Sequence, residues 1–289
     1  MDQEKLKEGV LCELKMGRWD AKVRLPKEQL GRSVPKDIIR AVQDVIDDKS
    51  LLKELSAIRR SAKFILKNNS LPFPIDSVFW IPKDKIELVN EKLEEAKINN
   101  EEVIKRLLQN FGKLKSDFKE KYPDFYNEDK YPSVDQLKEK YYFFWHFFTL
   151  NLPDKEGGIL SPALYKKEKE KFNGLIKEME TMTITLIGNQ LLKRVEALSE
   201  QCEAGKVNAR TVTSLNRFFK RWDELWAGTI NESKVKEIIF TLKKTMKTVS
   251  PERLQNNEHL QGKIQEKLEN AMVNLKKIPN VKLKRKLDI

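Results

Sequence analysis

The run Tyr141-Tyr-Phe-Phe-Trp-His-Phe-Phe148 places seven aromatic rings and one imidazole in eight successive positions. Successive side chains on a helix point about 100° apart, so such a run would be apolar on every side of a helix and would have to be enclosed. Ser133 and Gln136, just before it, match the capping box that opens a helix. The sequence therefore predicts a buried aromatic helix over residues 133–148, at the centre of the fold.

Before this run, short alternating segments lie between helical ones. Alternation of apolar and polar residues predicts a hairpin over residues 9–25, with its turn at Gly17. Ser77–Ile81 is a short apolar run that Pro82 closes, as in a buried strand. Helical spacing predicts helices over 33–46, 51–67 and 83–121, the first with a stripe of Ile38, Ile39, Val42, Val45 and Ile46 and the last with a break at Asn99-Asn100.

After the run, helical spacing predicts four further helices, over 161–202, 208–227, 231–247 and 250–278. Residues 181–187 alternate and are β-branched, which by itself favours a strand. Regular helical spacing on both sides of them favours one uninterrupted helix, which is the interpretation we prefer.

Together these elements predict a mainly α (α+β) protein. Its architecture is a multi-helix bundle with long helices and a small antiparallel sheet or hairpin near the N-terminus. The loop Pro153–Gly158 predicts a division into an N-terminal α+β part (1–153), a C-terminal all-helical part (159–278) and a basic tail (279–289).

Composition narrows the protein class. Charged residues make up 35% of 289 positions, and Gly and Pro number only 11 each, as in helix-rich proteins. Apolar runs stay well below the roughly 18 residues that span a bilayer, and residues 1–8 lack the apolar core of a secretory signal, so no membrane span and a cytoplasmic location are expected. Two cysteines, Cys12 and Cys202, and two histidines predict neither a disulfide framework nor a metal site nor a cofactor.

Positive charge is concentrated at the C-terminal end. The net charge is +12, and residues 243–289 hold 12 Lys and Arg against 5 Asp and Glu. Six of these cations follow one another closely and are candidate nucleic-acid contacts: Lys276, Lys277, Lys282, Lys284, Arg285 and Lys286. No aromatic residue lies among them, so they would contact phosphates without reading sequence. A solvated tail with no partner is the alternative.

Two apolar patterns are candidate helix–helix interfaces. The first repeats at the spacing of a helix–helix seam and comprises Ile264, Leu268, Ala271, Leu275 and Ile278. The second is Trp222 and Trp226, one helical turn apart. These two rings are either an exposed anchor for a partner or packing against adjacent helices, and we prefer packing.

Motifs of known chemistry are missing from the sequence. It contains neither a phosphate-binding G-x-x-x-x-G-K-[ST] loop nor G-x-G-x-x-G. His146 has no partner at the spacing of a catalytic triad. The aromatic run resembles core more than a base-stacking platform, because such platforms present a few exposed rings among Lys and Arg. The sequence therefore names no catalytic residue.

Several stretches resemble a bacterial and phage family known as domain of unknown function 3150. They are Gly9–Trp19, Phe79–Pro82, Tyr131–Trp145, Leu150–Pro153 and Ser214–Phe219 with Asp223-Glu-Leu. The resemblance implies a mostly helical protein, often encoded near MoxR-type AAA ATPases and von Willebrand A-domain proteins. It transfers no catalytic residue.

Three hypotheses of function follow. The first is a non-enzymatic helical interaction or adaptor protein that assembles with itself or with a helical or AAA-ATPase partner. The second is a nucleic-acid-associated protein that uses the basic C-terminal segment without sequence preference. An enzyme of unfamiliar type is the third.

Overall fold

The structure is mainly helical and has a small antiparallel sheet, as the sequence predicted. The computed structural model describes residues 6–25, 41–151, 160–228, 233–247 and 249–278. The chain forms two compact units. Unit 1 comprises Met1–Leu11, Asn69–Lys83 and Phe148–Ile289, and unit 2 comprises Cys12–Asn68 and Asp84–Phe147.

The two units are interleaved along the sequence. Segments from the first 83 residues belong to the same unit as the C-terminal helices. The loop Pro153–Gly158, where the sequence suggested a division, lies outside the described residues. That this loop separates an N-terminal α+β part from a C-terminal all-helical part therefore stays a prediction.

Two long helices form the frame of unit 2, α2 (Ser50–Asn69) and α3 (Ile86–Lys121). Buried positions of α3 recur every three or four residues from Val89 to Phe118. Asn100 is buried in phase with Ala96 and Val103, so α3 continues through the position where the sequence predicted a break. An apolar stripe that stays in phase outweighs the weak helix propensity of two asparagines.

The aromatic run is a strand, and its prediction as a helix was wrong. The capping box of Ser133 and Gln136 does open a helix, α4, but this ends at Glu139. The strand β6 (Phe143–Phe148) follows. Its rings alternate, with Phe143 buried while Tyr142 and Phe144 are 47% and 38% exposed. Aromatic residues favour strands, and a pleated strand divides their rings between two faces, so full enclosure is unnecessary.

The predicted hairpin over 9–25 is also wrong, although its alternating segments are extended. The first strand, β1 (Gly9–Met16), lies between β5 (Val78–Pro82) and β6 in a sheet of order β4-β5-β1-β6, where β4 is Leu71–Pro72. At the predicted turn, the Gly17 amide instead donates to the Tyr142 carbonyl at 2.9 Å, so the chain continues beside the aromatic segment.

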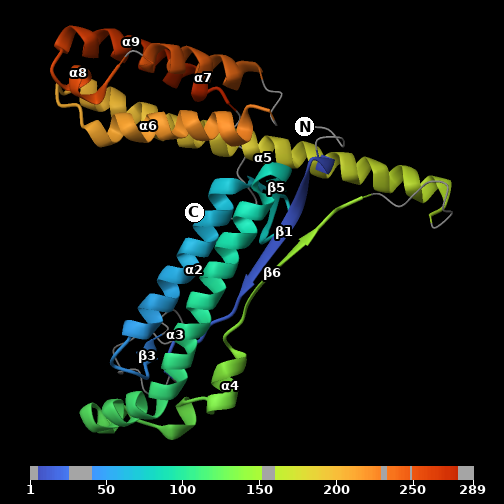
Figure 1. Cartoon of the computed structure of the whole chain (residues 1–289), viewed down its shortest axis with the longest axis vertical. Coiled ribbons are helices and arrows are strands. Elements are labelled where there is room, and N and C mark those ends of the chain that lie inside the picture. Colours follow the sequence, from blue (N-terminus) through green and yellow to red (C-terminus); the bar gives the residue numbers. More distant parts are fainter. Residues whose placement is uncertain (1–5, 26–40, 152–159, 229–232, 248, 279–289) are drawn as a thin grey trace. The chain divides into compact units, whose positions relative to one another are not determined.

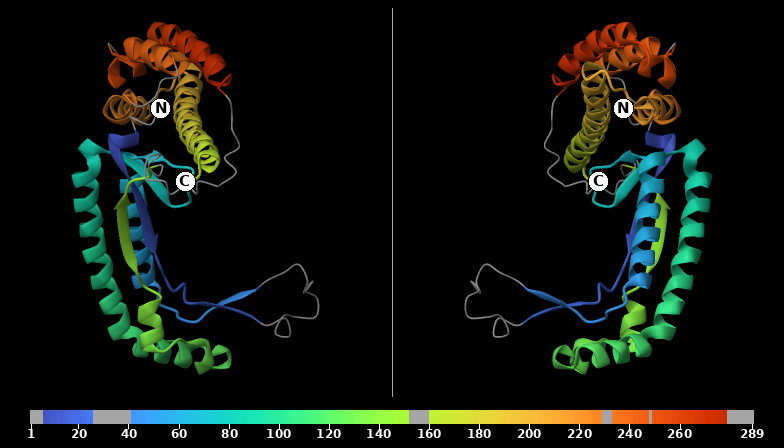
Figure 2. Two further views of the ribbon diagram at one scale, coloured as in Figure 1. Left: turned by 90° about the vertical axis from the view of Figure 1, so that its right-hand side faces the viewer. Right: turned by 90° about the vertical axis from the view of Figure 1, so that its left-hand side faces the viewer.

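A second, two-stranded sheet takes up the other half of the expected hairpin. Strand β2 (Lys22–Arg24) pairs antiparallel with β3 (Val42–Asp44), with Val23 opposite Gln43. The helix predicted over 33–46 is therefore wrong at its described end, and Ile38 and Ile39 lie outside the described residues. Figure 2 shows the ribbon of β2 and β3 extending away from α2 and α3.

The core of unit 2 joins these elements. Trp19 meets Phe111 of α3 edge to face, with ring centroids 5.5 Å apart. The Tyr131 hydroxyl donates to the Val45 carbonyl at 2.5 Å. The buried residues of this core are Trp19, Ala21, Val45, Ile46, Leu55, Val103, Leu107, Phe111, Leu114 and Leu137.

Unit 1 is built on α5 (Pro162–Glu203), whose N-terminus is capped by Ser161. Residues 181–187 are helical, as preferred above. The Thr181 and Thr183 hydroxyls donate to carbonyls one turn back, at 2.8 Å each, which lets these β-branched residues fit a helix.

In the described part of unit 1, four shorter helices and a π-turn follow α5. They are α6 (Ala209–Arg221), the π-helical turn Trp222–Trp226, α7 (Ser233–Met246), α8 (Pro251–Gln255) and α9 (Glu258–Leu275). Of these helices, α6 and α9 pack against α5, whereas α7 and α8 pack against α6 and α9. Figure 1 shows them gathered along the C-terminal half of α5. The predicted helix over 250–278 divides into α8 and α9 because the Asn257 side chain accepts from the Leu260 amide at 2.9 Å and starts a new helix. None of the described helices is long and apolar enough to cross a membrane.

We predict that Gly17→Ala destabilises unit 2. A Cβ on Gly17 would overlap the Tyr142 ring and approach the Lys140 carbonyl oxygen to 2.5 Å. Such crowding costs about 1–3 kcal/mol of unfolding free energy. Urea denaturation followed by circular dichroism measures the change.

The matched control is Gly112→Ala, at an exposed position of α3 where a Cβ meets nothing within 4 Å. This change should stabilise the helix by up to about 1 kcal/mol. Equal stability of the two variants would contradict the proposed close approach of Gly17 and Tyr142.

We also predict a loss of stability at high pH. Burial raises the pKa of Tyr131 and of Tyr141 to about 12, and each hydroxyl donates to a main-chain carbonyl. An unfolded tyrosine titrates near pH ~10. Because the folded pKa is the higher one, this stabilisation is complete below about pH 10 and is lost as the pH rises through about 12.

Urea unfolding at several pH values above about 9 measures this loss. In Tyr131→Phe and Tyr141→Phe, the decline should be shallower than in the unmodified protein, since each variant lacks one titrating group. A decline of the same steepness in all three proteins would show that other groups cause it.

Candidate functional site: a groove between α5, α7 and α9

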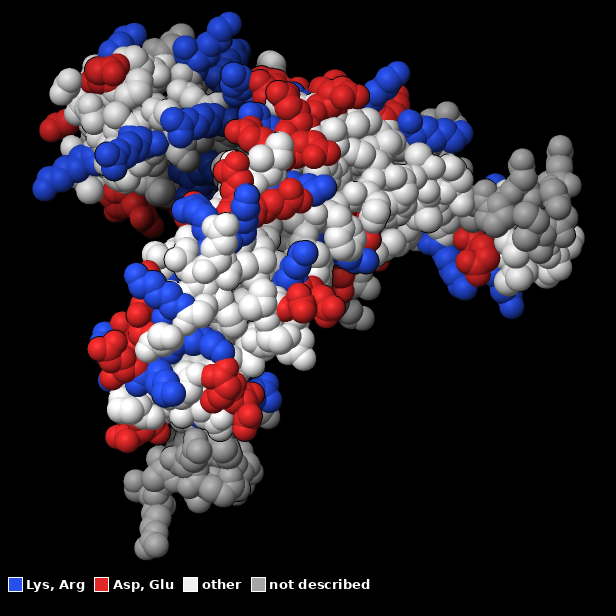
Figure 3. Space-filling model, turned by 60° about the horizontal axis from the view of Figure 1, so that its bottom comes forward, with Lys and Arg blue, Asp and Glu red and all other residues white. Residues whose placement is uncertain are grey.

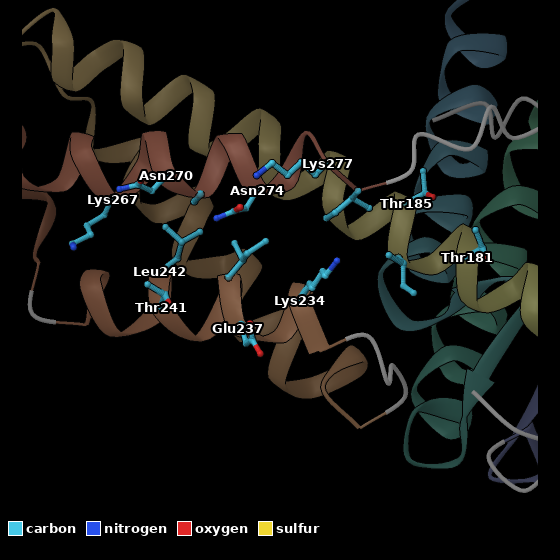
Figure 4. Close-up of a pocket in the computed structure, with 14 residues that line it drawn as sticks. Thr181, Thr185, Lys234, Glu237, Thr241, Leu242, Lys267, Asn270, Asn274 and Lys277 are labelled. Carbon is cyan, nitrogen blue, oxygen red and sulfur yellow. The ribbon is translucent and has the colours of Figure 1, made fainter.

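A groove of about 900 Å³ opens in unit 1 between three helices. Thr181, Ile184 and Thr185 of α5 line one side, and α7 and α9 supply the others (Figure 4). The lining residues of α7 are Lys234, Glu237, Ile238, Thr241 and Leu242. Those of α9 are Lys267, Asn270, Ala271 and Asn274, and Lys277 and Ile278 follow just after this helix.

Two adjacent stripes of α9 explain why the groove forms here. One is the predicted seam, whose members Ile264, Leu268, Ala271 and Leu275 are at most 7% exposed. The helix packs through it against α5 and α7. The second stripe consists of polar groove residues at spacings of three, four and three: Lys267, Asn270, Asn274 and Lys277. The seam therefore fixes the direction in which the polar stripe points.

The groove combines positive charge with an apolar floor. Lys234, Lys267 and Lys277 line it, and within the described part of the chain none of them forms an ion pair. Glu237 is the one carboxylate among the described lining residues. In Figure 4, Lys267 and Asn274 project from α9 toward α7, and Lys234 projects from α7. The floor contains Ile184, Ile238, Leu242, Ala271 and Ile278.

The polar side chains of the groove can recognise oxygen acceptors. Lysine ammonium groups and the Asn270 and Asn274 amides donate hydrogen bonds to carboxylate or carbonyl oxygens. In the described ranges, no three His, Cys, Asp or Glu side chains come together as a metal site. The pKa of the buried Cys12 thiol is raised to about 12 by burial and by Glu13, and burial also raises the pKa of Cys202. Both thiols therefore stay protonated and weakly nucleophilic near neutral pH.

The predicted basic residues do not stay together where the structure describes them. Lys276 pairs with Glu196 of α5 at 3.5 Å, whereas Lys277 lines the groove. Neighbouring residues on a helical turn point in different directions, which separates the two ammonium groups. Lys282, Lys284, Arg285 and Lys286 lie outside the described residues.

The predicted interface residues lie within unit 1 itself. Trp222 and Trp226 are 5% and 0% exposed, and Trp226 packs on Phe218 with ring centroids 5.6 Å apart. The Arg221 guanidinium lies 4.7 Å from the centre of the Trp226 ring. Burial, with the charge of Arg194 as a second cause, lowers the pKa of Arg221 to about 10. The seam residues face α5 and α7, and Ile278 is half-buried at the groove.

Sequence reasoning missed most of the groove. Lys234, Lys267, Asn270 and Asn274 were not singled out, although the last two share a helical face with Lys267. Their spacing of three and four beside an apolar seam is a signal that could have found the α9 half. The contribution of α7 has no such signal, because it depends on how the helices pack.

Comparison with known proteins places the chain in a family without revealing its activity. The model of the family described as "Protein of unknown function (DUF3150)" matches residues 6–262. The chain belongs to this family. Neither the curated proteins nor the solved structures contain a match. The groove of this DUF3150 protein therefore has to be interpreted from its own chemistry.

We predict that Leu268→Ala lowers the free energy of unfolding by about 2–5 kcal/mol, because it opens a cavity in the seam. Leu268 is 1% exposed between α9 and its neighbours. Thermal unfolding measures the loss, and light scattering compares the oligomeric state before and after the change. The control is Val273→Ala on the same helix, where the side chain is 56% exposed and the expected change is within about 0.5 kcal/mol.

A change in oligomeric state without loss of stability would contradict this assignment. It would mean that Leu268 contacts a second chain and not α5 and α7.

Proposed function

We propose that this protein is a non-enzymatic interaction protein whose α5–α7–α9 groove binds an acidic, amphipathic helical segment of a partner protein. The observation that carries the proposal is the set of three lysines without carboxylate partners in the described structure, above an apolar floor. A helix with leucine-like residues on one face and carboxylates on its flanks complements both features. Burial of apolar area would supply affinity, and the charges would set orientation.

The chain's own basic tail is a poorer occupant of the groove. The segment after Ile278 carries Lys282, Lys284, Arg285 and Lys286 against Asp288. Lysines on the groove would repel such a segment. Charge complementarity therefore favours a separate, acidic partner over this segment.

Family context suggests one class of partner. The resemblance drawn from the sequence implies a neighbouring MoxR-type AAA ATPase, and a helical segment of such an ATPase is a candidate occupant. The basic C-terminal segment as a nucleic-acid contact remains the alternative function, and it rests on residues mostly outside the described part of the chain.

Charge reversal in the groove tests the proposal. The variant Lys234→Glu, Lys267→Glu, Lys277→Glu should bind a designed 18-residue peptide, with Leu at helical spacing and Glu on its flanks, about tenfold or more weakly. Three exposed charge pairs of roughly 0.5 kcal/mol each account for this factor. Fluorescence anisotropy measures the affinity, and a peptide with Lys in place of Glu should bind the variant better than the original.

Three other exposed lysines of unit 1 provide the control, Lys166→Glu, Lys169→Glu and Lys206→Glu, which leave the groove unchanged. If both triple variants bind the peptide equally weakly, the change in net charge explains the loss of affinity, and the groove is not the binding site. A chain shortened at Ile278 that binds the acidic peptide much more tightly would instead show that the tail competes for the groove.

A further inference from the structure

A second groove, of about 730 Å³, lies in unit 2 beside α2. Its lining is far more basic than that of the first groove. Asp20 is the one carboxylate among the described lining residues. Six lining residues carry positive charge: Arg18, Lys49, Lys53, Arg59, Arg60 and Lys63. No sequence motif had indicated this cluster.

Three of these cations form a row that remains available to a ligand. Lys53, Arg60 and Lys63 recur at helical spacing on α2, and Ser56 lies between the first two on the same face. A rise of about 1.5 Å per residue makes this row about 15 Å long. Lys49 and Arg18 pair with Asp44 and Asp20, at 2.5 Å each. Within the described ranges, Lys53, Arg60 and Lys63 have no carboxylate in ion-pair contact.

Arg59 connects this row to the end of β1. Its guanidinium donates to the main-chain carbonyls of Gly17 and Met16, the latter at 2.5 Å. Burial and the nearby charge of Arg18 lower the pKa of Arg59. The guanidinium is thus held in place by neutral main-chain acceptors.

A row of exposed rings begins next to Arg59. Tyr142 packs against Gly17, whose carbonyl accepts from Arg59. Phe144 and His146 follow on the same face of β6, with ring-centre distances of 5.6 Å and 5.4 Å along the row. Strand alternation places all three rings opposite the buried Phe143. The ring row thus starts at the arginine that adjoins the α2 cations, and exposed rings together with cations are the features of a base-stacking platform.

The charge balance of this groove differs from that of the face shown in Figure 3, where Lys and Arg are interspersed with Asp and Glu. Six cations and one carboxylate line the groove.

We propose that unit 2 binds single-stranded nucleic acid through this composite site, with phosphates on the α2 row and bases on Tyr142, Phe144 and His146. Phosphates and carboxylates both suit the cations, but the carboxylates of an acidic peptide do not stack on aromatic rings as bases do. Bases of an intact duplex are stacked on each other and cannot reach them. A flexible single strand satisfies both halves of the site. Because every base has a flat face, such binding is independent of sequence.

Oligothymidylate of 20 nucleotides with a fluorescent end label is the probe, and the full chain is the protein. Anisotropy is measured between 50 and 200 mM salt. In Lys53→Gln, Arg60→Gln, Lys63→Gln, affinity should fall at least tenfold at the lower salt concentration. The slope of log affinity against log salt should become shallower by about 2, as for the loss of three phosphate contacts to a single strand.

The ring variant is Tyr142→Ala, Phe144→Ala. It should weaken oligothymidylate binding by about tenfold with an almost unchanged salt slope, because loss of stacking removes no charge. The same variant should leave weaker binding to a 20-base-pair duplex unaffected. Circular dichroism and thermal unfolding confirm that each variant is folded.

Two controls separate this site from other basic regions. The chain shortened at Ile278 and the variant Lys166→Glu, Lys169→Glu, Lys206→Glu should both retain most of the affinity. Loss of binding in the shortened chain alone would overturn the proposal in favour of the basic tail. Unchanged binding by the α2 variant would also overturn it. Sensitivity to the α2 row without sensitivity to the rings would reject single-strand recognition, since an acidic protein segment would then fit equally well.

Discussion

A pleated strand can bury half of a run of bulky rings, because alternate side chains face opposite sides. On β6 the pleat turns Phe143 inward and leaves Tyr142 and Phe144 exposed, so neighbouring residues meet different environments. The Gly17 amide continues this arrangement by bonding to the Tyr142 carbonyl. In the described part of the sheet, β6 is an edge strand next to β1. The position of Trp19 in the core, the anchoring of Arg59 and the exposed ring row all follow from this one strand.

Unit 1 depends on a different constraint: the buried seam occupies one side of α9. Residues at helical spacing from Ile264 to Leu275 are buried against α5 and α7. Since a helix presents its next stripe only a fraction of a turn away, the groove residues Lys267 and Asn274 are held beside the seam. The seam residues are committed within the chain, so the polar stripe next to them is what the groove exposes.

Much of the helical content was predictable because it is recorded in local spacing. The boundaries of α2, α5 and α6 follow from apolar periodicity and from caps such as Ser161 and Asn208. The errors have a common physical origin. Whether Phe143–Phe148 is helix or strand depends on β1, which is more than a hundred residues away in sequence. The true partner of β2 is likewise β3 and not the segment just before it. Pairing between distant segments leaves no trace in local periodicity.

The candidate sites show the same division. The seam of α9 could be found from its spacing, and so could the cations near the C-terminus, yet neither observation identifies a groove. Grooves require distant segments, such as α7 beside α9 or the Gly17–Asp20 segment beside α2. Lys53, Arg60 and Lys63 resemble any solvated helix face in the sequence. They become distinctive only because Arg59 holds the end of β1 next to them.

The two grooves differ in chemistry although both are basic. The groove of unit 1 has lysines above isoleucine and leucine, a lining that suits an apolar face with negative charge. The groove of unit 2 has arginines and lysines, and a row of aromatic rings starts beside Arg59, a combination that suits dense negative charge and flat rings. An amphipathic acidic helix has the first pair of properties and a single nucleic-acid strand has the second, which is why the two proposals differ.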